Sequence, residues 1–256
     1  MERSQIIDIK QFNTFYDINY HSIDRLIQFG QIKHIKKNTL IIEEKQKNEN
    51  IFFLLQGIAY NYCLFENDSK RILNIENQGH FLNEDAIYQE YASSNIKVLK
   101  NSTILVIPIS IIKELIHDNF LFSQKIQSSL ASKYIENQNL LKFNPYQNSQ
   151  ARLTIYLCYL AHKLGIPYQD DIEIPFDFSV VFLSQLIGAK RETTSRILNQ
   201  LIDQDFIYYH QKHLVIKNLN LFNHLKSIAF SWYFFKTLNL KYLWYVQPAF
   251  LFQSII

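Results

Sequence analysis

The sequence has little cysteine, glycine, proline and methionine. Its 256 residues include two Cys, five Gly, five Pro and one Met. Cys63 and Cys158 lie far apart in unrelated contexts, and the histidines are scattered without metal-ligand spacing. This distribution gives no disulfide framework, zinc site or iron–sulfur site, so we expect free thiols and no bound metal.

The motifs of common enzyme families are also missing. The sequence has no glycine-rich phosphate loop, no nucleophile elbow and no paired catalytic carboxylates. We therefore predict that the protein is not an enzyme, although one of its domains can still bind a ligand without transforming it.

A strong excess of charge is absent as well. The 26 basic and 23 acidic residues leave a formal net charge of +3, so a nucleic-acid interface would have to be a local feature. The first residues, MERSQIIDIKQF, carry charges where a secretory signal needs an apolar run. Abundant Ile, Asn, Lys and Tyr are typical of AT-rich coding DNA. We expect the protein to stay where it is made, in a plastid stroma if it is plastid-encoded and otherwise in a bacterial cytoplasm.

Residues 226–256 are rich in aromatic side chains and contain both tryptophans. Lys236, Lys241 and Pro248 interrupt this apolar segment, which leaves no span of about 20 residues for a transmembrane helix. We interpret the segment as a tail packed on its own protein and expect no membrane partner. Contact with a partner protein or a membrane surface is the alternative.

Short strands separated by polar turns are predicted for residues 31–108. Tyr60 and Tyr62 alternate with more polar neighbours, as in a strand with one buried face. Gly57 and Gly79 are predicted to occupy turns or bulges that a side chain would disfavour. We expect these strands to form a compact antiparallel barrel or sandwich.

The period of the apolar residues changes after Pro108. ISIIKELI is predicted to be helical, and one long amphipathic helix is predicted from Asn119 to about Phe143. This helix either packs on its own barrel or forms half of a dimer coiled coil, and the periodicity alone leaves both open. NPYQNSQ at 144–150 then breaks the helix and marks a domain boundary. The apolar positions of the long helix are Ile126, Leu130, Tyr134 and Leu141.

Helix, turn, helix and β-hairpin follow in that order after residue 151. RLTIYLCYLAHKLG is predicted to be a helix ended by Gly165, and DIEIPFDFS an extended linker. VVFLSQLIG and KRETTSRILNQLIDQD are predicted to be the next two helices, and FIYYHQ and HLVIKNL two short strands. This order is the outline of a winged helix-turn-helix.

The second of these helices carries the candidate DNA-reading residues. Gly188 stands where the tight turn is needed, and an apolar stripe places Arg191, Glu192 and Arg196 on the opposite face near the helix N-terminus. Arg pairs with guanine and Glu accepts from cytosine, so this set can read G and C edges. We expect phosphate contacts from Lys190, Thr193, Thr194 and Ser195. The apolar stripe consists of Ile197, Leu198, Leu201 and Ile202.

A plainer interpretation of the same residues is an ordinary surface ion pair. Glu192 and Arg196 stand four residues apart, and such a pair would contribute only about 0.3 to 0.5 kcal/mol. The context favours the DNA-binding interpretation. Residues 188–217, from the predicted turn through the predicted hairpin, hold five Lys or Arg against three Asp or Glu.

The segment LSQLIGAKRETTSRILNQLIDQDFI resembles the DNA-binding signature of the Crp/Fnr family of transcription regulators in its turn, arginines, glutamate and apolar helix. The resemblance covers most of the chain and implies an α+β fold. It implies a cyclic-nucleotide-binding-like β-roll at 1–115, a dimerisation helix and hinge at 116–147, a winged helix-turn-helix at 148–225, and an extension at 226–256.

A finer resemblance concerns ARLTIYLCYLAHKLGIPYQDDIEIPF, which is similar to the linker of the NtcA-type global nitrogen regulators of cyanobacteria and red-algal plastids. The base-reading roles of Arg191, Glu192 and Arg196 follow from the family resemblance too. Glu192 departs from the nitrogen regulators, which usually carry an apolar residue there. The departure implies a TGTGA-like half-site rather than the GTA type.

The resemblance also implies an effector site in QGHFLNEDAIYQEYASSNIKV. This span lacks the arginine with which the cyclic-AMP branch holds a phosphate, so cyclic AMP is disfavoured as an effector. The nitrogen regulators imply 2-oxoglutarate, which is held by two arginines; Lys133 could replace one of them, but lysine lacks the planar fork. Effector-free function stays open. The candidate effector residues are Gly79, Phe81, Leu82, Ser93, Ser94 and Lys133.

The sequence therefore predicts a transcription regulator, for global nitrogen control, that binds a palindromic site in double-stranded DNA as a homodimer and acts with RNA polymerase. A ligand sensor that acts through protein–protein contacts of its aromatic tail is the rival hypothesis. The charged helix face argues against that rival, because protein interfaces favour aromatic and apolar anchors at their centres.

Overall fold

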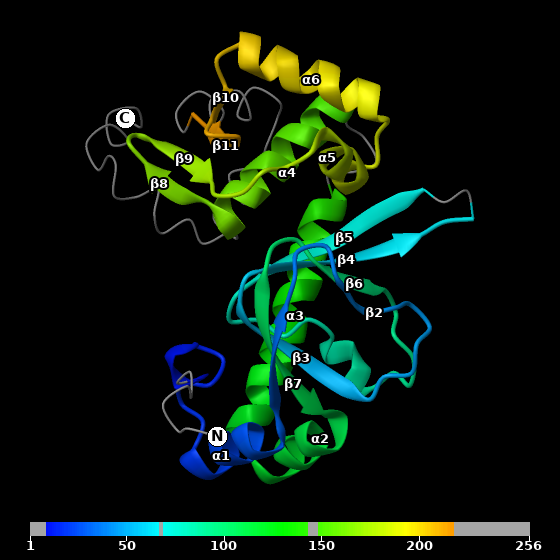
Figure 1. Cartoon of the computed structure of the whole chain (residues 1–256), viewed down its shortest axis with the longest axis vertical. Coiled ribbons are helices and arrows are strands. Elements are labelled where there is room, and N and C mark those ends of the chain that lie inside the picture. Colours follow the sequence, from blue (N-terminus) through cyan, green and yellow to red (C-terminus); the bar gives the residue numbers. More distant parts are fainter. Residues whose placement is uncertain (1–8, 67–68, 143–147, 218–256) are drawn as a thin grey trace, which may run out of the picture. The chain divides into compact units, whose positions relative to one another are not determined.

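The computed structural model describes residues 9–66, 69–142 and 148–217 (Figure 1). The chain divides into two compact units, Met1–Leu141 and Lys142–Ile256. The first unit contains two β-sheets and helices, and the second contains a helix-turn-helix and a small sheet. The expected α+β class is therefore confirmed. The aromatic segment 226–256 lies outside the described residues.

The first unit contains the predicted antiparallel strands. One sheet has three strands in the order β1-β7-β3, and the other has four in the order β2-β6-β4-β5. All neighbouring strands run antiparallel. The strands are β1 (Gln31–Ile35), β2 (Leu40–Ile42), β3 (Asn50–Gln56), β4 (Ile58–Leu64), β5 (Lys70–Asn77), β6 (Asn95–Val98) and β7 (Ser102–Pro108).

Helices close one side of this roll. The short helix η2 (Ile9–Gln11) and α1 (Tyr20–Phe29) precede the strands, η3 (Glu84–Ile87) lies between β5 and β6, and α2 (Ile109–Asp118) follows β7. The larger core cluster joins these helices to β3 and β7 through residues such as Phe15, Phe53 and Phe81. A second cluster, which includes Leu54 and Ile104, fills the interior of the roll.

Gly57 occupies the turn between β3 and β4, as the sequence predicts. Its φ is 113°, and an added Cβ would lie 2.9 Å from the Cα of Ser102 and closer still to the Ser102 side chain. Gly79 also has a positive φ, of 90°. Both turn predictions are confirmed, because L side chains rarely adopt these φ values.

The long helix α3 (Phe120–Lys142) divides into two parts by burial. Phe122 and Ile126 are buried in the core of the first unit, and Leu130 packs against that core. Tyr134 and Leu141, which belong to the same predicted stripe, are exposed. The first half of α3 therefore packs on its own domain, and the second half presents apolar side chains to solvent.

The second unit begins with α4 (Ser149–Leu164), which has Gly165 at its C-terminal end as predicted. Helices α5 (Val180–Ile187) and α6 (Arg191–Asp203) follow and pack against α4 and each other. Burial raises the pKa of the Cys158 thiol in α4 to about 12, so this thiol stays protonated and unreactive.

One expectation for this unit is wrong. DIEIPFDFS is not an extended linker, because its first residues pair in a sheet of four strands ordered β10-β11-β9-β8. Ile174 in β9 lies opposite Leu214 in β11. The hairpin of β8 and β9 therefore extends the predicted wing, β10 and β11, into a larger sheet. The strands are β8 (Ile166–Tyr168), β9 (Asp171–Ile174), β10 (Ile207–His210) and β11 (His213–Ile216).

The described residues contain neither a membrane-spanning helix nor a cluster of metal ligands. No described helix is long and apolar enough to cross a membrane. No group of three or more His, Cys, Asp or Glu side chains between residues 9 and 217, outside the gaps at 67–68 and 143–147, could hold a metal ion.

Candidate functional site

The candidate DNA-reading helix is positioned by a tight turn after α5. The Ser179 hydroxyl accepts a hydrogen bond from the Phe182 N–H at 3.0 Å and caps the start of α5. Gly188 ends the helix with φ 63° and ψ 47°, a left-handed conformation that suits glycine. The Ala189 N–H then donates to the Ser184 carbonyl at 3.1 Å. These contacts fix the direction in which α6 begins.

Helix α4 braces this turn through Arg152. The Arg152 Nε donates to the Ile187 carbonyl at 3.3 Å, and its Nη2 donates to the Ser149 hydroxyl at 3.2 Å. A cation at the C-terminal end of α5 is electrostatically favourable, because the last carbonyls of a helix carry partial negative charge. The arginine therefore stabilises the geometry of the turn.

The buried face of α6 agrees with most of the predicted stripe. Ile197, Leu198 and Leu201 are buried, while Ile202 is only partly buried. Thr194 is also fully buried, and its hydroxyl donates to the Lys190 carbonyl at 3.0 Å. The expectation that Thr194 contacts a DNA phosphate is therefore wrong, because its side chain packs inside the domain.

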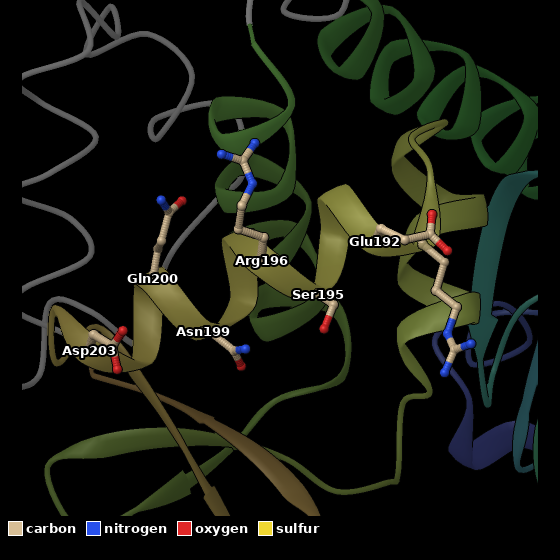
Figure 2. Close-up of a pocket in the computed structure, with 7 residues that line it drawn as sticks. Glu192, Ser195, Arg196, Asn199, Gln200 and Asp203 are labelled. Carbon is tan, nitrogen blue, oxygen red and sulfur yellow. The ribbon is translucent and has the colours of Figure 1, made fainter.

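The opposite face of α6 is exposed and polar. In Figure 2, Arg196 and Gln200 project from one edge of this face, and Ser195 and Asn199 from the other. The structure thus brings together three predicted residues, Arg191, Glu192 and Arg196, with Ser195. The residues that line the surface pocket along this face are Arg191, Glu192, Ser195, Arg196, Asn199, Gln200 and Asp203.

The surface ion pair expected as the plainer interpretation does not form. Among the ion pairs of the described residues, none involves Arg191, Glu192 or Arg196. All three side chains are exposed. The guanidinium groups of Arg191 and Arg196 and the carboxylate of Glu192 are therefore available to an external partner. No ion pair with another described residue holds them in place.

The N-terminus of α6 offers donors beside this face. Lys190 is the N-cap residue, and its side chain makes no capping hydrogen bond. The first N–H groups of a helix carry partial positive charge and lack partners within the helix. Lys190 is exposed and Thr193 partly exposed, so a phosphate group could approach both of them here.

The wing presents a further exposed cation, Lys212. Strands β10 and β11 are joined through Gln211 and Lys212, which both have positive φ, of 48° and 71°. This geometry belongs to the tight hairpin turn that favours Asn and Gly. Lys212 is exposed at the tip of the hairpin, where a side chain can reach a phosphate backbone.

Sequence reasoning missed several members of this surface. Asn199, Gln200 and Asp203 follow Glu192 and Arg196 at helical spacing, so the period of the exposed face could have identified them. Lys212 could have been found from its place between two predicted strands. The same helical period would also have assigned Thr194 to the buried stripe, since it precedes Ile197 and Leu198 by three and four residues.

The predicted effector residues of the first unit have diverse surroundings. Phe81 and Leu82 are buried, and the Leu82 N–H donates to the Phe52 carbonyl at 2.8 Å. The Gly79 N–H donates to the Leu54 carbonyl at 2.8 Å. Lys133 lies beside this segment, because its Nζ donates to the Phe81 carbonyl at 2.6 Å.

The two predicted serines are already engaged within the domain. The exposed Ser93 hydroxyl donates to Asp85 at 2.5 Å. Ser94 is buried, and its hydroxyl accepts a hydrogen bond from Asn61 at 3.3 Å. The candidate effector segment, QGHFLNEDAIYQEYASSNIKV, contains no arginine that could act together with these serines.

Two family models match this chain. The cyclic nucleotide-binding domain matches residues 32–119, and the Crp-like helix-turn-helix domain matches residues 151–225. The first lies in the unit that contains the β-roll, and the second contains α5, α6 and the wing.

Known proteins resemble the chain over most of its length. The HTH-type transcriptional regulator ycf28 of Porphyra purpurea is 26% identical over 73% of this chain and 78% of its own. The global nitrogen regulator of Nostoc sp. is 20% identical over 72% of this chain and 84% of its own. The solved structure of the global regulator CLP of Xanthomonas campestris has a TM-score of 0.68 and 13% identity, and the match covers 78% of this chain and 100% of that one. At this identity the structural likeness establishes the fold alone.

Proposed function

This chain belongs to the Crp/Fnr family of DNA-binding transcription regulators, and from that premise we propose that it reads a palindromic DNA site as a homodimer through the exposed face of α6. Arg191, Glu192 and Arg196 read base edges in the major groove. Lys190, Thr193 and Ser195 hold the phosphate backbone. The family consists of regulators rather than enzymes, and its members bind DNA as dimers.

The observation that carries this proposal is the unpaired charge on α6. The helix buries one face against its own domain and leaves Arg191, Glu192 and Arg196 exposed, without ion pairs to other described residues. Arg donates bidentately to guanine O6 and N7, and Glu accepts from cytosine N4. A DNA duplex supplies partners of both kinds, at the depth a helix reaches in the major groove.

The dimer is supported by the second half of α3. Tyr134, Ile135 and Leu141 are exposed there, with exposed fractions of 65%, 54% and 55%. Apolar side chains on an exposed helix favour pairing with a second helix. A two-fold dimer would place two copies of α6 about 34 Å apart, in successive major grooves of a palindromic site.

The biological role that we propose is control of nitrogen genes, together with RNA polymerase. The support is the similarity to the global nitrogen regulator of Nostoc sp. and to ycf28 of Porphyra purpurea. The red-algal relative and the AT-rich composition favour a plastid stroma as the place of action, with a bacterial cytoplasm as the alternative. The first domain belongs to a type that binds small-molecule effectors.

The proposed boundaries are those that the family resemblance implies. The sensor domain covers 1–115, the dimerisation helix and hinge cover 116–147, and the DNA-binding domain covers 148–225. The chain divides into its two compact units between Leu141 and Lys142, within the proposed dimerisation helix and hinge. Residues 226–256, the proposed extension, lie outside the described residues.

The test is selection of bound sequences from random duplex DNA with the purified full-length protein. We expect enrichment of a palindrome, and a loss of about 1 to 3 kcal/mol on that palindrome for Arg191→Ala or Arg196→Ala, with relaxed base preference. Lys113→Ala is a charge-matched control, because Lys113 is an exposed residue of α2 in the other unit. Equal losses on specific and random DNA would reject base reading, and no enrichment by a folded dimer would reject the proposed function.

A further inference from the structure

A buried charge cluster joins α3 to the β-roll. The Lys133 ammonium lies 2.6 Å from a carboxylate oxygen of Glu84 and 3.5 Å from one of Glu76. Only 15% of the Lys133 side chain is exposed, against 2% for Glu84 and 1% for Glu76. The Ser129 hydroxyl, also on α3, donates to the other oxygen of Glu84. We call Lys133, Glu76 and Glu84 the ion cluster.

One member of the cluster, Glu84, lies in the segment where the family resemblance expects an effector. Glu84 begins η3, two residues after the predicted effector residue Leu82, and Glu76 is in β5. Lys133 also donates to the Phe81 carbonyl, at 2.6 Å. The lysine that could have bound an anionic ligand is therefore already surrounded by acceptors of its own chain.

Lys133 stays charged in this setting. Burial acts to lower the pKa of Lys133, but the carboxylates of Glu76 and Glu84 outweigh burial, and the pKa is raised overall. The Glu76 carboxylate is further stabilised by a hydrogen bond from the Asn74 amide at 2.7 Å. One ammonium thus faces two carboxylates, and the cluster carries an excess of negative charge.

An anionic ligand does not fit this arrangement. A cyclic nucleotide phosphate or a dicarboxylate needs cationic and N–H donors. The N–H groups of Gly79 and Leu82 are bonded to Leu54 and Phe52, and the ammonium of Lys133 is bonded to Phe81 and Glu84. An incoming anion would meet two buried carboxylates and would have to remove their counterion, which is strongly unfavourable in a desolvated site.

We propose that Lys133 is a built-in substitute for an effector, so that the sensor domain holds α3 against the β-roll without an anionic ligand. The ammonium makes the bridge between helix and roll that a bound anion would otherwise make. Neither cyclic AMP nor 2-oxoglutarate then binds at this site, and DNA binding does not depend on them.

The position of Lys133 on α3 links this bridge to dimer formation. Leu130 packs on the core of the first unit and Tyr134 is exposed, so Lys133 stands where the helix leaves the core. A fixed bridge at this point determines the rotation with which the exposed apolar residues are presented to a second copy. This step rests on the proposed function, since it assumes that the dimer binds DNA.

Ligand binding is tested first on the full-length protein without DNA. We expect isothermal titration with cyclic AMP and with 2-oxoglutarate to give no saturable heat, and neither compound to shift the melting temperature. Stoichiometric binding of either compound would overturn the proposal, whatever the protein does with DNA. A failure to select any DNA sequence would instead count against the proposed function alone.

The bridge is then tested by variants. Lys133→Met should lower the affinity for the selected palindrome by at least about tenfold, because two carboxylates lose their counterion and α3 loses its bridge. Lys125→Met is the matched control: Lys125 lies on the same helix, in a half-exposed ion pair with Asp17 at 3.7 Å. The control should change affinity by less than about twofold.

A triple variant separates the bridge from simple charge balance and covers the case in which Lys133→Met does not fold. Glu76→Gln and Glu84→Gln, combined with Lys133→Met, remove every charge of the cluster and should restore the melting temperature. DNA affinity should stay low, because methionine cannot donate to Glu84 or Phe81. Recovery of full DNA affinity by this variant would mean that Lys133 is only a counterion, and would overturn the bridge.

Discussion

The hydroxyl of Thr194 in α6 donates to the carbonyl of Lys190, the N-cap residue four positions earlier, at a distance of 3.0 Å. The Thr194 N–H donates to the same carbonyl, also at 3.0 Å. Thr194 therefore faces the interior, although its neighbours Thr193 and Ser195 are partly exposed. Two adjacent threonines of one helix thus have different environments, and only one of them can reach DNA.

Thr194→Val is expected to leave DNA binding unchanged within about twofold while lowering stability by about 0.5 to 1.5 kcal/mol. The Lys190 carbonyl keeps its backbone hydrogen bond, so only the hydroxyl contact is lost. Thr193→Val is the matched variant and should weaken binding to specific and random DNA alike. Fluorescence anisotropy and chemical denaturation measure the two effects. Equal losses of affinity for both variants would contradict this assignment.

Asn199→Ala should change sequence preference at one position of each half-site. Asn199 lies on the exposed face with Arg196, and an asparagine amide pairs with adenine N6 and N7. The expected cost on the preferred sequence is about 1 to 3 kcal/mol. Repeating the selection from random DNA measures the altered preference. Gln204→Ala, at the C-terminal end of α6, is the control, and the prediction fails if both variants select the same sequences as the wild type.

Lys212→Gly should stabilise the DNA-binding domain and weaken DNA binding at the same time. The φ of Lys212 is 71°, a conformation that glycine adopts without the cost of a side chain, so we expect a gain of up to about 1 kcal/mol. Loss of its phosphate contact should reduce the slope of log affinity against log salt by about 1. Thermal denaturation and binding at several salt concentrations measure these effects. An unchanged salt slope would show that the wing tip does not touch phosphate.

The stability of the first domain should rise with pH through the ionisation of Lys70. Burial, followed by repulsion from Lys97, lowers the pKa of Lys70 from 10.5 to about 8. The unfolded chain therefore binds more protons than the folded one between pH 8 and 10.5, and the stability contributed by this residue increases across that window. The Lys70 ammonium lies 3.6 Å from the centre of the Tyr62 ring and donates to the Tyr60 hydroxyl at 3.0 Å. Both tyrosines belong to β4, which therefore covers the ammonium.

Chemical denaturation of the wild type and Lys70→Met at several pH values measures this effect. The difference in free energy of unfolding, wild type minus variant, should move in favour of the wild type from pH 8 to 10.5. Subtraction of the variant removes contributions from the tyrosines. A flat difference would mean that Lys70 keeps its ordinary pKa in the folded state, and a falling one that its pKa is raised there; either result would contradict the prediction.

Much of the fold is predictable from the sequence where local patterns coincide with tertiary packing. The stripe of Ile197, Leu198 and Leu201 predicts the buried face of α6, and Gly188 predicts the turn before it. Helix α1 was not predicted, although Asn19 caps it and Ile23 and Leu26 form its buried side. These local signals are sufficient to predict α1 from the sequence.

Other features depend on contacts between distant residues and could not be predicted from one segment. The pairing of β9 cannot be predicted from its own segment, because its partner β11 lies about 40 residues later in the sequence. Glu84 and Lys133 are 49 residues apart, and the sequence around either residue does not indicate that the other is its partner. The candidate DNA-reading residues belong to one helix, so the helical period alone predicts that they share a face. The residues of the ion cluster come from β5, η3 and α3, and only the tertiary fold brings them together.

The pairing of β9 with β11 constrains the order in which the DNA-binding domain can mature during synthesis. Helices α4, α5 and α6 emerge from the ribosome before residues 213–216, yet β9 finds its second neighbouring strand, β11, only in that later segment, after it has paired with β8 on its other edge. Until it emerges, β9 presents an open edge to which another strand could add. A nascent chain stalled within the first residues after α6 should therefore be a target for chaperones, and release of the last strand should end that exposure.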